Sequence, residues 1–185
     1  MKNSDLKKTG QLNEEELLSY FSEHVLYEIK QLINATYAIN KRLPIHNGLQ
    51  NTVVESFAIH LRNLITFLYP FNRQEDDVCA EDFFCEAMTW ENLRCKKSDT
   101  LQNAKKRADK EVGHLTTARQ FGTPKSKEWD VVTLTEEVMP IIKLFCESSD
   151  RVGLQELFIP VWNMYLLNKK SWESGSEKGD SHHSF

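Results

Sequence analysis

Hydrophobic residues recur at helical spacing from an early point in the chain. Asn13 and Glu16 have the spacing of a capping box, in which each side chain accepts a hydrogen bond from the other residue's backbone N–H. Beyond them, steps of three and four residues link Leu18, Phe21, Val25, Ile29, Leu32, Thr36 and Ile39. The pattern predicts a long amphipathic helix that ends near Pro44, because the stretch LPIHNGLQN combines a proline, a glycine and two asparagines.

A second helix is predicted from about Asn51 to Tyr69. The centre of its apolar face consists of Val53, Phe57, Leu61, Leu64 and Leu68. A second row runs along one flank of that face and consists of Ser56, His60, Asn63 and Phe67. Polar side chains beside a core face indicate that a partner lies next to them.

Further helices are predicted in the rest of the chain. The aromatic segment VCAEDFFCEAMTW, residues 78–90, fits a short helix, and the segment KKRADKEVGHLTTAR, residues 105–119, belongs to a long one. A helix over about residues 135–146 can be capped by its first residue, a threonine followed by two glutamates. A last helix is predicted over about residues 154–167, where Pro160 is expected to produce a kink.

These elements predict an all-α fold, an antiparallel up-and-down bundle of about four long helices plus short ones. A chain of 185 residues has the usual size of one domain. We place that domain at residues 13–170, between a flexible N-terminus at residues 1–12 and a disordered tail at residues 171–185. A hydrophobic content of 40%, with only seven glycines and five prolines, is typical of a helical protein and not of a sandwich or a fibre.

Location and redox state follow from what the sequence lacks. No run approaches the roughly 18 apolar residues of a membrane span, and the N-terminal MKNSDLKKTGQLNEEE has no apolar core for a signal peptide. We therefore expect a cytoplasmic protein without membrane contact. No C-x-x-C pair occurs, and the cysteines are expected to be reduced thiols; they are Cys79, Cys85, Cys95 and Cys146.

Charge is unevenly distributed along the chain. The formal net charge of −4 argues against a dedicated DNA-binding domain, since affinity for a polyanion depends on Lys and Arg. Residues 74–93 include seven acidic residues and no basic one, whereas residues 94–119 include eight basic residues and three acidic ones. The one locally basic segment therefore coincides with the predicted third long helix.

Arg107 and His114 are the strongest candidates for chemistry in this basic segment. They are seven residues apart, two helical turns, so their Cα atoms are about 10 Å apart along the axis of a regular helix. A histidine transfers protons near neutral pH, and a guanidinium binds a phosphate with two hydrogen bonds. On the same flank lie Asn103 and Glu111, with Lys110 at its outer edge. Such a pair suits cleavage of RNA by its own 2′-hydroxyl.

The octapeptide RADKEVGH, Arg107 to His114, resembles the R-x(4 to 6)-H motif of HEPN domains. That resemblance implies a helical bundle that is frequently a homodimer, with two motifs facing one cleft, and metal-independent RNase activity in the catalytic members. Many HEPN domains belong to prokaryotic toxin and phage-defence systems, and much of the family binds or scaffolds without cleavage. The chain departs from the family pattern at Ala108, where the residue after the arginine is commonly polar.

A structural role explains the same residues without any substrate. Arg107 can pair with Glu111 at i,i+4 while His114 packs against a neighbouring helix. His60 and Asn63, together with Ser56, can likewise satisfy one another or a backbone carbonyl between helices.

A metal site is a further alternative, because Glu111 to His114 also forms an E-x-x-H motif. Additional ligands could come from Glu55, His60, Asp76, Asp77, Glu81 and Asp82. Helical di-iron bundles need the motif on two helices, and this chain has it once. We therefore expect no metal and no cofactor.

Two functions remain as hypotheses. In the first, the protein is a HEPN-like metal-independent RNase or RNA-binding defence or toxin-type protein, with Arg107 and His114 as catalytic residues. Substrate contacts would then come from Asn103, Lys110, His60 and Asn63. In the second, it is a non-enzymatic helical module that binds another protein, and the same residues are structural.

Overall fold

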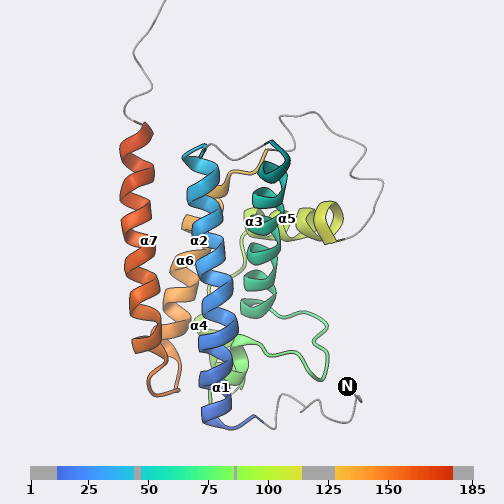
Figure 1. Ribbon diagram of the computed structural model, residues 1–185. Coiled ribbons are helices and arrows are strands. Elements are labelled where there is room, and N and C mark those ends of the chain that lie inside the picture. Colours follow the sequence, from blue (N-terminus) through green and yellow to red (C-terminus); the bar gives the residue numbers. More distant parts are fainter. Residues whose placement is uncertain (1–11, 44–46, 86, 114–127, 177–185) are drawn as a thin grey trace, which may run out of the picture.

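The computed structural model describes residues 12–43, 47–85, 87–113 and 128–176 (Figure 1). Among them every regular element is helical, and the predicted all-α class is confirmed. Helix α2 runs up the bundle and α3 down beside it; α6 descends behind α2, and α7 rises along the outer edge of the bundle (Figure 1). This is the predicted antiparallel arrangement. No helix within the described ranges is both long enough and apolar enough to cross a bilayer.

The first predicted helix is one rod with an irregular turn inside it. Helix α1 (Glu14–Tyr20) continues through the π-helical turn η3 (Phe21–Val25) into α2 (Leu26–Asn40). The capping box is confirmed, with both hydrogen bonds between Asn13 and Glu16 at 3.0 Å. The π turn was not predicted, since both of its ends, Phe21 and Val25, are buried at ordinary helical steps.

Helix α3 (Asn47–Leu68) is followed by a region that differs from the prediction. Instead of one short helix over residues 78–90, there are a 3₁₀ turn η4 (Ala80–Phe83) and a separate helix α4 (Ala87–Leu93). The break lies at Phe84, whose backbone is extended, with φ −116° and ψ 149°. This extended residue places Phe84 in the core beside Phe83, and tertiary packing therefore overrides helical continuity.

The helix predicted over residues 135–146 begins earlier than expected. Helix α6 (Val131–Ser148) is capped by Asp130, whose side chain accepts a hydrogen bond from the Thr133 N–H at 3.2 Å. The prediction that Thr135 caps the helix was wrong. Its hydroxyl is fully buried and lies 2.7 Å from the hydroxyl of Thr36 in α2, which itself donates to the Leu32 carbonyl at 2.8 Å.

The last helix is longer than predicted. Helix α7 (Leu154–Ser176) continues past residue 167, and Trp172 is buried, so the described part of the expected tail, residues 171–176, is helical. The aromatic side chain at 172 lies on the same face as the buried Phe158 and Tyr165, which explains why the helix continues. Residues 177–185 and 1–11 lie outside the described ranges.

The third of the predicted long helices is shorter than expected and ends in an irregular turn. Helix α5 (Asp99–Ala108) has an N-cap at Ser98, whose hydroxyl accepts from the Leu101 N–H at 3.1 Å. It passes into a second π-helical turn, η5 (Asp109–Gly113). Because α5 packs on α3 and α6, its buried face is formed by Leu101, Ala104 and Ala108. Residues 114–119 of the predicted helix lie outside the described ranges.

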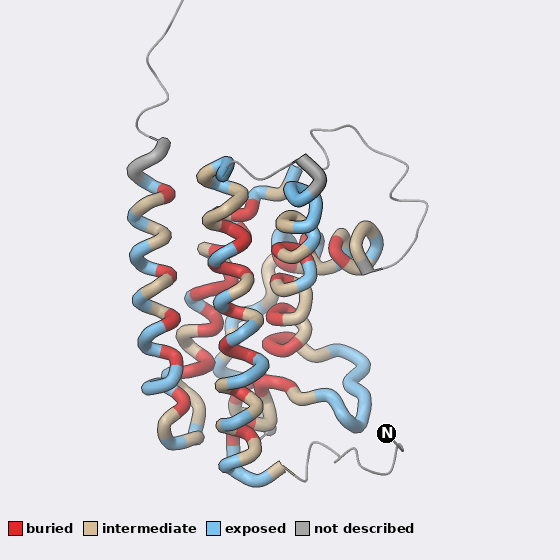
Figure 2. Tube along the Cα trace, viewed as in Figure 1, coloured by how far each residue is buried: buried red, intermediate tan, exposed pale blue. Residues whose placement is uncertain are grey.

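An aromatic cluster around Phe145 of α6 ties the lower end of the bundle together. The Phe145 ring centroid lies between 5.3 and 6.3 Å from those of five other aromatic residues: Phe21, Phe67, Phe83, Phe84 and Trp90. Most of these contacts are edge-to-face, the arrangement that aromatic quadrupoles favour. The Trp90 indole N–H also donates to the Leu68 carbonyl at 2.9 Å. Five separate elements therefore meet at one side chain, and Figure 2 shows the buried positions on the facing sides of the helices.

Replacing Phe145 with alanine is expected to lower the free energy of unfolding by about 3–5 kcal/mol, because the substitution opens a cavity that its neighbours cannot fill. Urea denaturation followed by circular dichroism measures the change. Phe71→Ala is the matched control, since that side chain is 84% exposed. Equal effects of the two substitutions would contradict the central position of Phe145.

Candidate functional site

Arg107 bonds two other residues and packs on an aromatic ring. Its Nε donates to Glu111 Oε2 at 2.8 Å, and its Nη1 donates to the Glu128 carbonyl at 2.7 Å. The guanidinium carbon lies 4.2 Å from the ring centroid of Trp129, which packs edge-to-face on the buried Phe57 at 6.0 Å. The predicted i,i+4 pair between Arg107 and Glu111 is thus confirmed, and the arginine is attached to the core through an aromatic ring.

The surroundings of Arg107 offer little room for a ligand. They form a hollow of about 250 Å³, below the roughly 300–1,000 Å³ of ligand pockets. Besides the arginine, its lining includes two carboxylates, those of Glu55 and Glu111. Asn103 and Lys110 are exposed on α5 and η5, and neither lines this hollow. The second half of the predicted couple, His114, lies outside the described residues.

The turn η5 also changes the geometry on which that couple was predicted. A π-helical turn contains more residues than an α-helical turn, so the 100° step used to align the flank does not apply over residues 109–113. Arg62 of α3 contacts this turn through an ion pair with Asp109, which Lys105 also contacts at 3.0 Å. Burial alone would raise the pKa of Asp109, but hydrogen bonds from these two cations lower it.

His60 and Asn63 are joined by a residue that the sequence did not identify. Glu28 of α2 places one carboxylate oxygen 2.7 Å from His60 Nδ1, and the same oxygen accepts from Asn63 Nδ2 at 3.2 Å. His60 is 12% exposed. The predicted partner of this polar flank is therefore the α2 helix, reached through a charged hydrogen bond. Neither His60 nor Asn63 lines the hollow beside Arg107.

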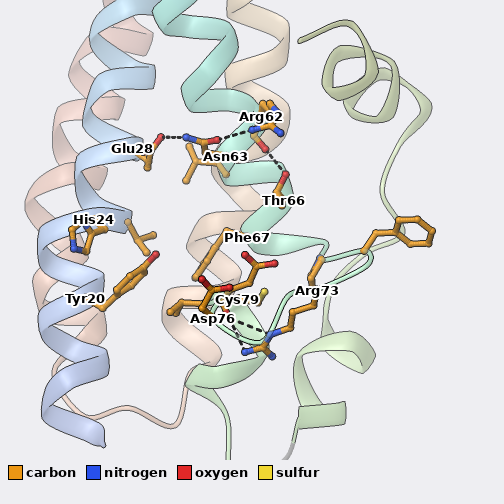
Figure 3. A pocket seen from close by; sticks show the side chains of 16 residues that line it. Tyr20, His24, Glu28, Arg62, Asn63, Thr66, Phe67, Arg73, Asp76 and Cys79 are labelled. Atoms are coloured by element: carbon orange, nitrogen blue, oxygen red, sulfur yellow. Dashed lines mark hydrogen bonds between the residues drawn. The ribbon is translucent and has the colours of Figure 1, made fainter. Parts of the chain in front are cut away.

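A second hollow is a cleft of about 590 Å³, within the size range of ligand pockets (Figure 3). One wall is the first rod at its π turn, which contributes Tyr20, His24 and Glu28. The opposite wall is the lower part of α3, with Asn63, Thr66 and Phe67, and the floor is the segment after α3, with Arg73, Asp76, Asp77 and Cys79. Figure 3 shows the labelled side chains of these three segments around the cleft.

The irregular turn explains how the first rod can form part of this cleft. A π turn inserts one residue into an α-helix and rotates the side chains that follow, and such turns are frequent at functional sites. Here it buries Phe21 and Val25 while His24 remains exposed beside Tyr20, the two rings 4.8 Å apart. The aromatic pair therefore lies at the edge of the cleft.

Both arginines of the cleft are already engaged by carboxylates. Arg62 pairs with Asp109. Arg73 donates through Nη2 to both carboxylate oxygens of Asp82 at 2.7 Å and to the Asp77 carbonyl at 2.9 Å. Neither Asp82 nor Asp109 lines the cleft, whereas Glu28, Asp76 and Asp77 do. With three carboxylates and two arginines, the lining carries a negative formal charge.

Neither Cys79 nor Tyr20 offers an activated nucleophile in this cleft. Burial raises the pKa of the Cys79 thiol to about 12, although Arg73 opposes the shift. Because the thiolate is the reactive species, this cysteine is an inert, buried group. Burial also raises the pKa of Tyr20, whose phenol remains a neutral hydrogen-bonding group.

The structure also separates the candidate metal ligands. In the described ranges, no three side chains among His, Cys, Asp and Glu come together in a geometry that could hold a metal ion. Glu81 and Asp82 instead face arginines, Glu81 at 3.0 Å from Arg94 and Asp82 at 2.7 Å from Arg73. Glu55 lies beside Arg107, away from the Glu28 and His60 pair.

The cleft was not predicted from the sequence, although one of its signals was present. The acidic run after α3 was visible, but its place opposite α2 depends on the chain path after Leu68. The π turn has no composition of its own in FSEHV. Comparison with known proteins adds no relative: no family model, no curated protein and no solved structure matches the chain.

Replacing Arg107 with alanine is expected to lower the free energy of unfolding by about 1–2 kcal/mol. The substitution removes one helical ion pair, one hydrogen bond to a carbonyl and one cation–π contact, each worth up to about 1 kcal/mol. Thermal and urea unfolding measure the loss. The adjacent and exposed Lys106→Ala is the control and should change stability by less than about 0.5 kcal/mol. An unchanged stability of Arg107→Ala would show that these contacts are not structural.

Proposed function

We propose that this protein is a non-enzymatic helical module that binds another protein, and that it receives a basic, partly apolar segment of that partner in the cleft. The observation that carries the proposal is the charge state of the cleft. Its two arginines are held by carboxylates from outside it, and its lining contains three carboxylates, of which Glu28 also bonds His60 and Asn63 and Asp77 accepts from the Gln74 N–H. A partner that supplies lysine or arginine gains from this surplus.

The walls of the cleft suit both the charged head and the methylene stem of a lysine or arginine side chain. Phe67, Val78 and the ring of Tyr20 form apolar surface next to the carboxylates. Lysine and arginine bury their methylene stems on apolar surface while the charged head contacts polar groups. The neutral Tyr20 ring at the edge also offers a face for a cation. A purely anionic ligand would meet the three carboxylates, and the two arginines of the lining already bind carboxylates from outside the cleft.

The hypothesis of a metal-independent RNase remains a proposal of second rank. It rests on Arg107 and His114, and only the arginine lies within the described residues. Arg107 already bonds a carboxylate and a carbonyl and lies beside Glu55 and Glu111, so a phosphate would have to displace those contacts against local negative charge. The same contacts support the alternative in which Arg107 is a structural residue.

Binding is tested with an amphipathic peptide of lysine and leucine and with the same peptide carrying glutamate at every lysine position. Isothermal titration calorimetry should detect binding of the lysine peptide alone, and that binding should weaken as salt screens the cleft. Asp76→Lys should raise the dissociation constant about fivefold or more, because it reverses an exposed charge at the rim. Glu91→Lys makes the same change in net charge outside the cleft and should have less than a twofold effect.

Three outcomes would contradict the proposal: no binding of the lysine peptide, equal binding of the glutamate peptide, or equal effects of the two charge reversals. The same preparations, incubated with a mixed RNA pool in EDTA, address the alternative. Cleavage that persists in the chelator and disappears in Arg107→Ala and His114→Ala variants of unchanged fold would favour the RNase. Absence of cleavage is the expected result.

A further inference from the structure

Helix α7 has an apolar stripe on the side that faces away from the bundle. Its inner face, which packs on α2 and α6, consists of Leu154, Phe158, Val161, Tyr165 and Trp172. On the opposite face Ile159 is 49% exposed, Leu166 37% and Leu167 69%. Figures 1 and 2 show α7 at the edge of the bundle, with exposed positions along its outer side and no described element beyond it. Outward apolar residues at helical spacing are typical of a surface that binds another helix.

The order of residues on this outer face is symmetric about Asn163. Steps of four, three, four and three lead through Glu156, Pro160, Asn163, Leu167 and Lys170, all exposed. Four apolar residues, Ile159, Pro160, Leu166 and Leu167, occupy the middle, with an acid at one end and a base at the other. Within the described part of the chain, neither Glu156 nor Lys170 has an ion-pair partner.

We propose that two copies of this chain associate through α7, antiparallel and about a two-fold axis at Asn163. In that register Glu156 of each copy faces Lys170 of the other, since both lie seven residues, about 10 Å, from Asn163. Ile159 faces Leu167, and Pro160 faces Leu166, for the same reason. The two asparagines meet at the axis, where a lone polar residue in an apolar seam specifies register. An interface that is complementary to itself is what two-fold symmetry requires.

The strength of the association follows from the size of the stripe. A single helix face of about four turns is smaller than the roughly 800 Å² per partner of a standard interface. The dimer is therefore weak and forms in proportion to concentration. A parallel arrangement in this register would place Glu156 against Glu156 and Lys170 against Lys170, and the charges therefore select the antiparallel one. The interface does not include α5, which lies on the other side of α2 (Figure 1), and no residue of α7 lines the cleft.

Sedimentation equilibrium over a range of concentrations up to about 1 mM tests the proposal with the full chain. The wild type should show a monomer–dimer equilibrium. Glu156→Lys alone and Lys170→Glu alone should each weaken it about tenfold or more, because both symmetric pairs become repulsive. An equimolar mixture of the two variants should associate again, since each pair then joins a lysine to a glutamate. The double variant Glu156→Lys, Lys170→Glu should associate like the wild type.

Leu167→Asp should abolish association without unfolding the protein, because the side chain is largely exposed. Leu49→Asp, at an exposed apolar position of α3, is the matched control and should associate normally. Thermal melting verifies that all variants are folded. A wild type that stays monomeric throughout, a dimer that tolerates both single charge reversals, or variants that fail to associate when mixed would each overturn the proposal.

Discussion

The packing around Phe145 is the constraint on which the rest of the structure depends. One ring on α6 contacts aromatic residues from η3, α3, η4, α4 and the extended residue between the last two. Such a junction accounts for two irregularities of the backbone. The chain leaves helical geometry at Phe84 so that both Phe83 and Phe84 can reach the cluster, and the π turn at residues 21–25 keeps Phe21 in it. The cleft is a consequence, because Phe67 belongs to the cluster and to the cleft wall at once. Its shape is therefore present before any ligand arrives, which lowers the entropic cost of binding.

Much of this architecture can be predicted from local signals. The capping box at Asn13 and the three-and-four spacing of the apolar residues in the first two helices are short-range features, and the structure reproduces them. The failures all involve distant partners. Thr135 is of a residue type that often caps helices, but it lies inside α6, where its hydroxyl forms a hydrogen bond with that of Thr36 across the core. The tail after residue 170 reads as polar, yet a single aromatic residue, Trp172, keeps it on the bundle as far as Ser176. Glu28 carries no signal of its own, and only the path of α3 brings it to His60 and Asn63.

The charged groups show how a motif and a site can differ. Arg107 has the sequence spacing of a catalytic residue, but its contacts attach the end of α5 to Glu128 and Trp129 in the segment before α6. Arg62 and Arg73 perform the same kind of work at the cleft, where each binds a carboxylate that does not line it. The charged groups that a partner can bind at the surface therefore depend on which charges are already paired within the fold. These pairings favour an acidic cleft on one side of the bundle and a self-complementary helix on the other. The two proposed surfaces could bind their partners at the same time.

The measurement that tests this account most directly is the location of the binding surface. Amide ¹H–¹⁵N spectra of the labelled full chain would be recorded during titration with the lysine and leucine peptide. We predict that the largest shifts fall on the cleft, at Tyr20, His24, Asn63 and Asp76, while the amides of α5 around Arg107 stay in place. Shifts centred on Arg107, with the cleft unchanged, would contradict the account and indicate that α5, which carries Arg107, is the binding surface.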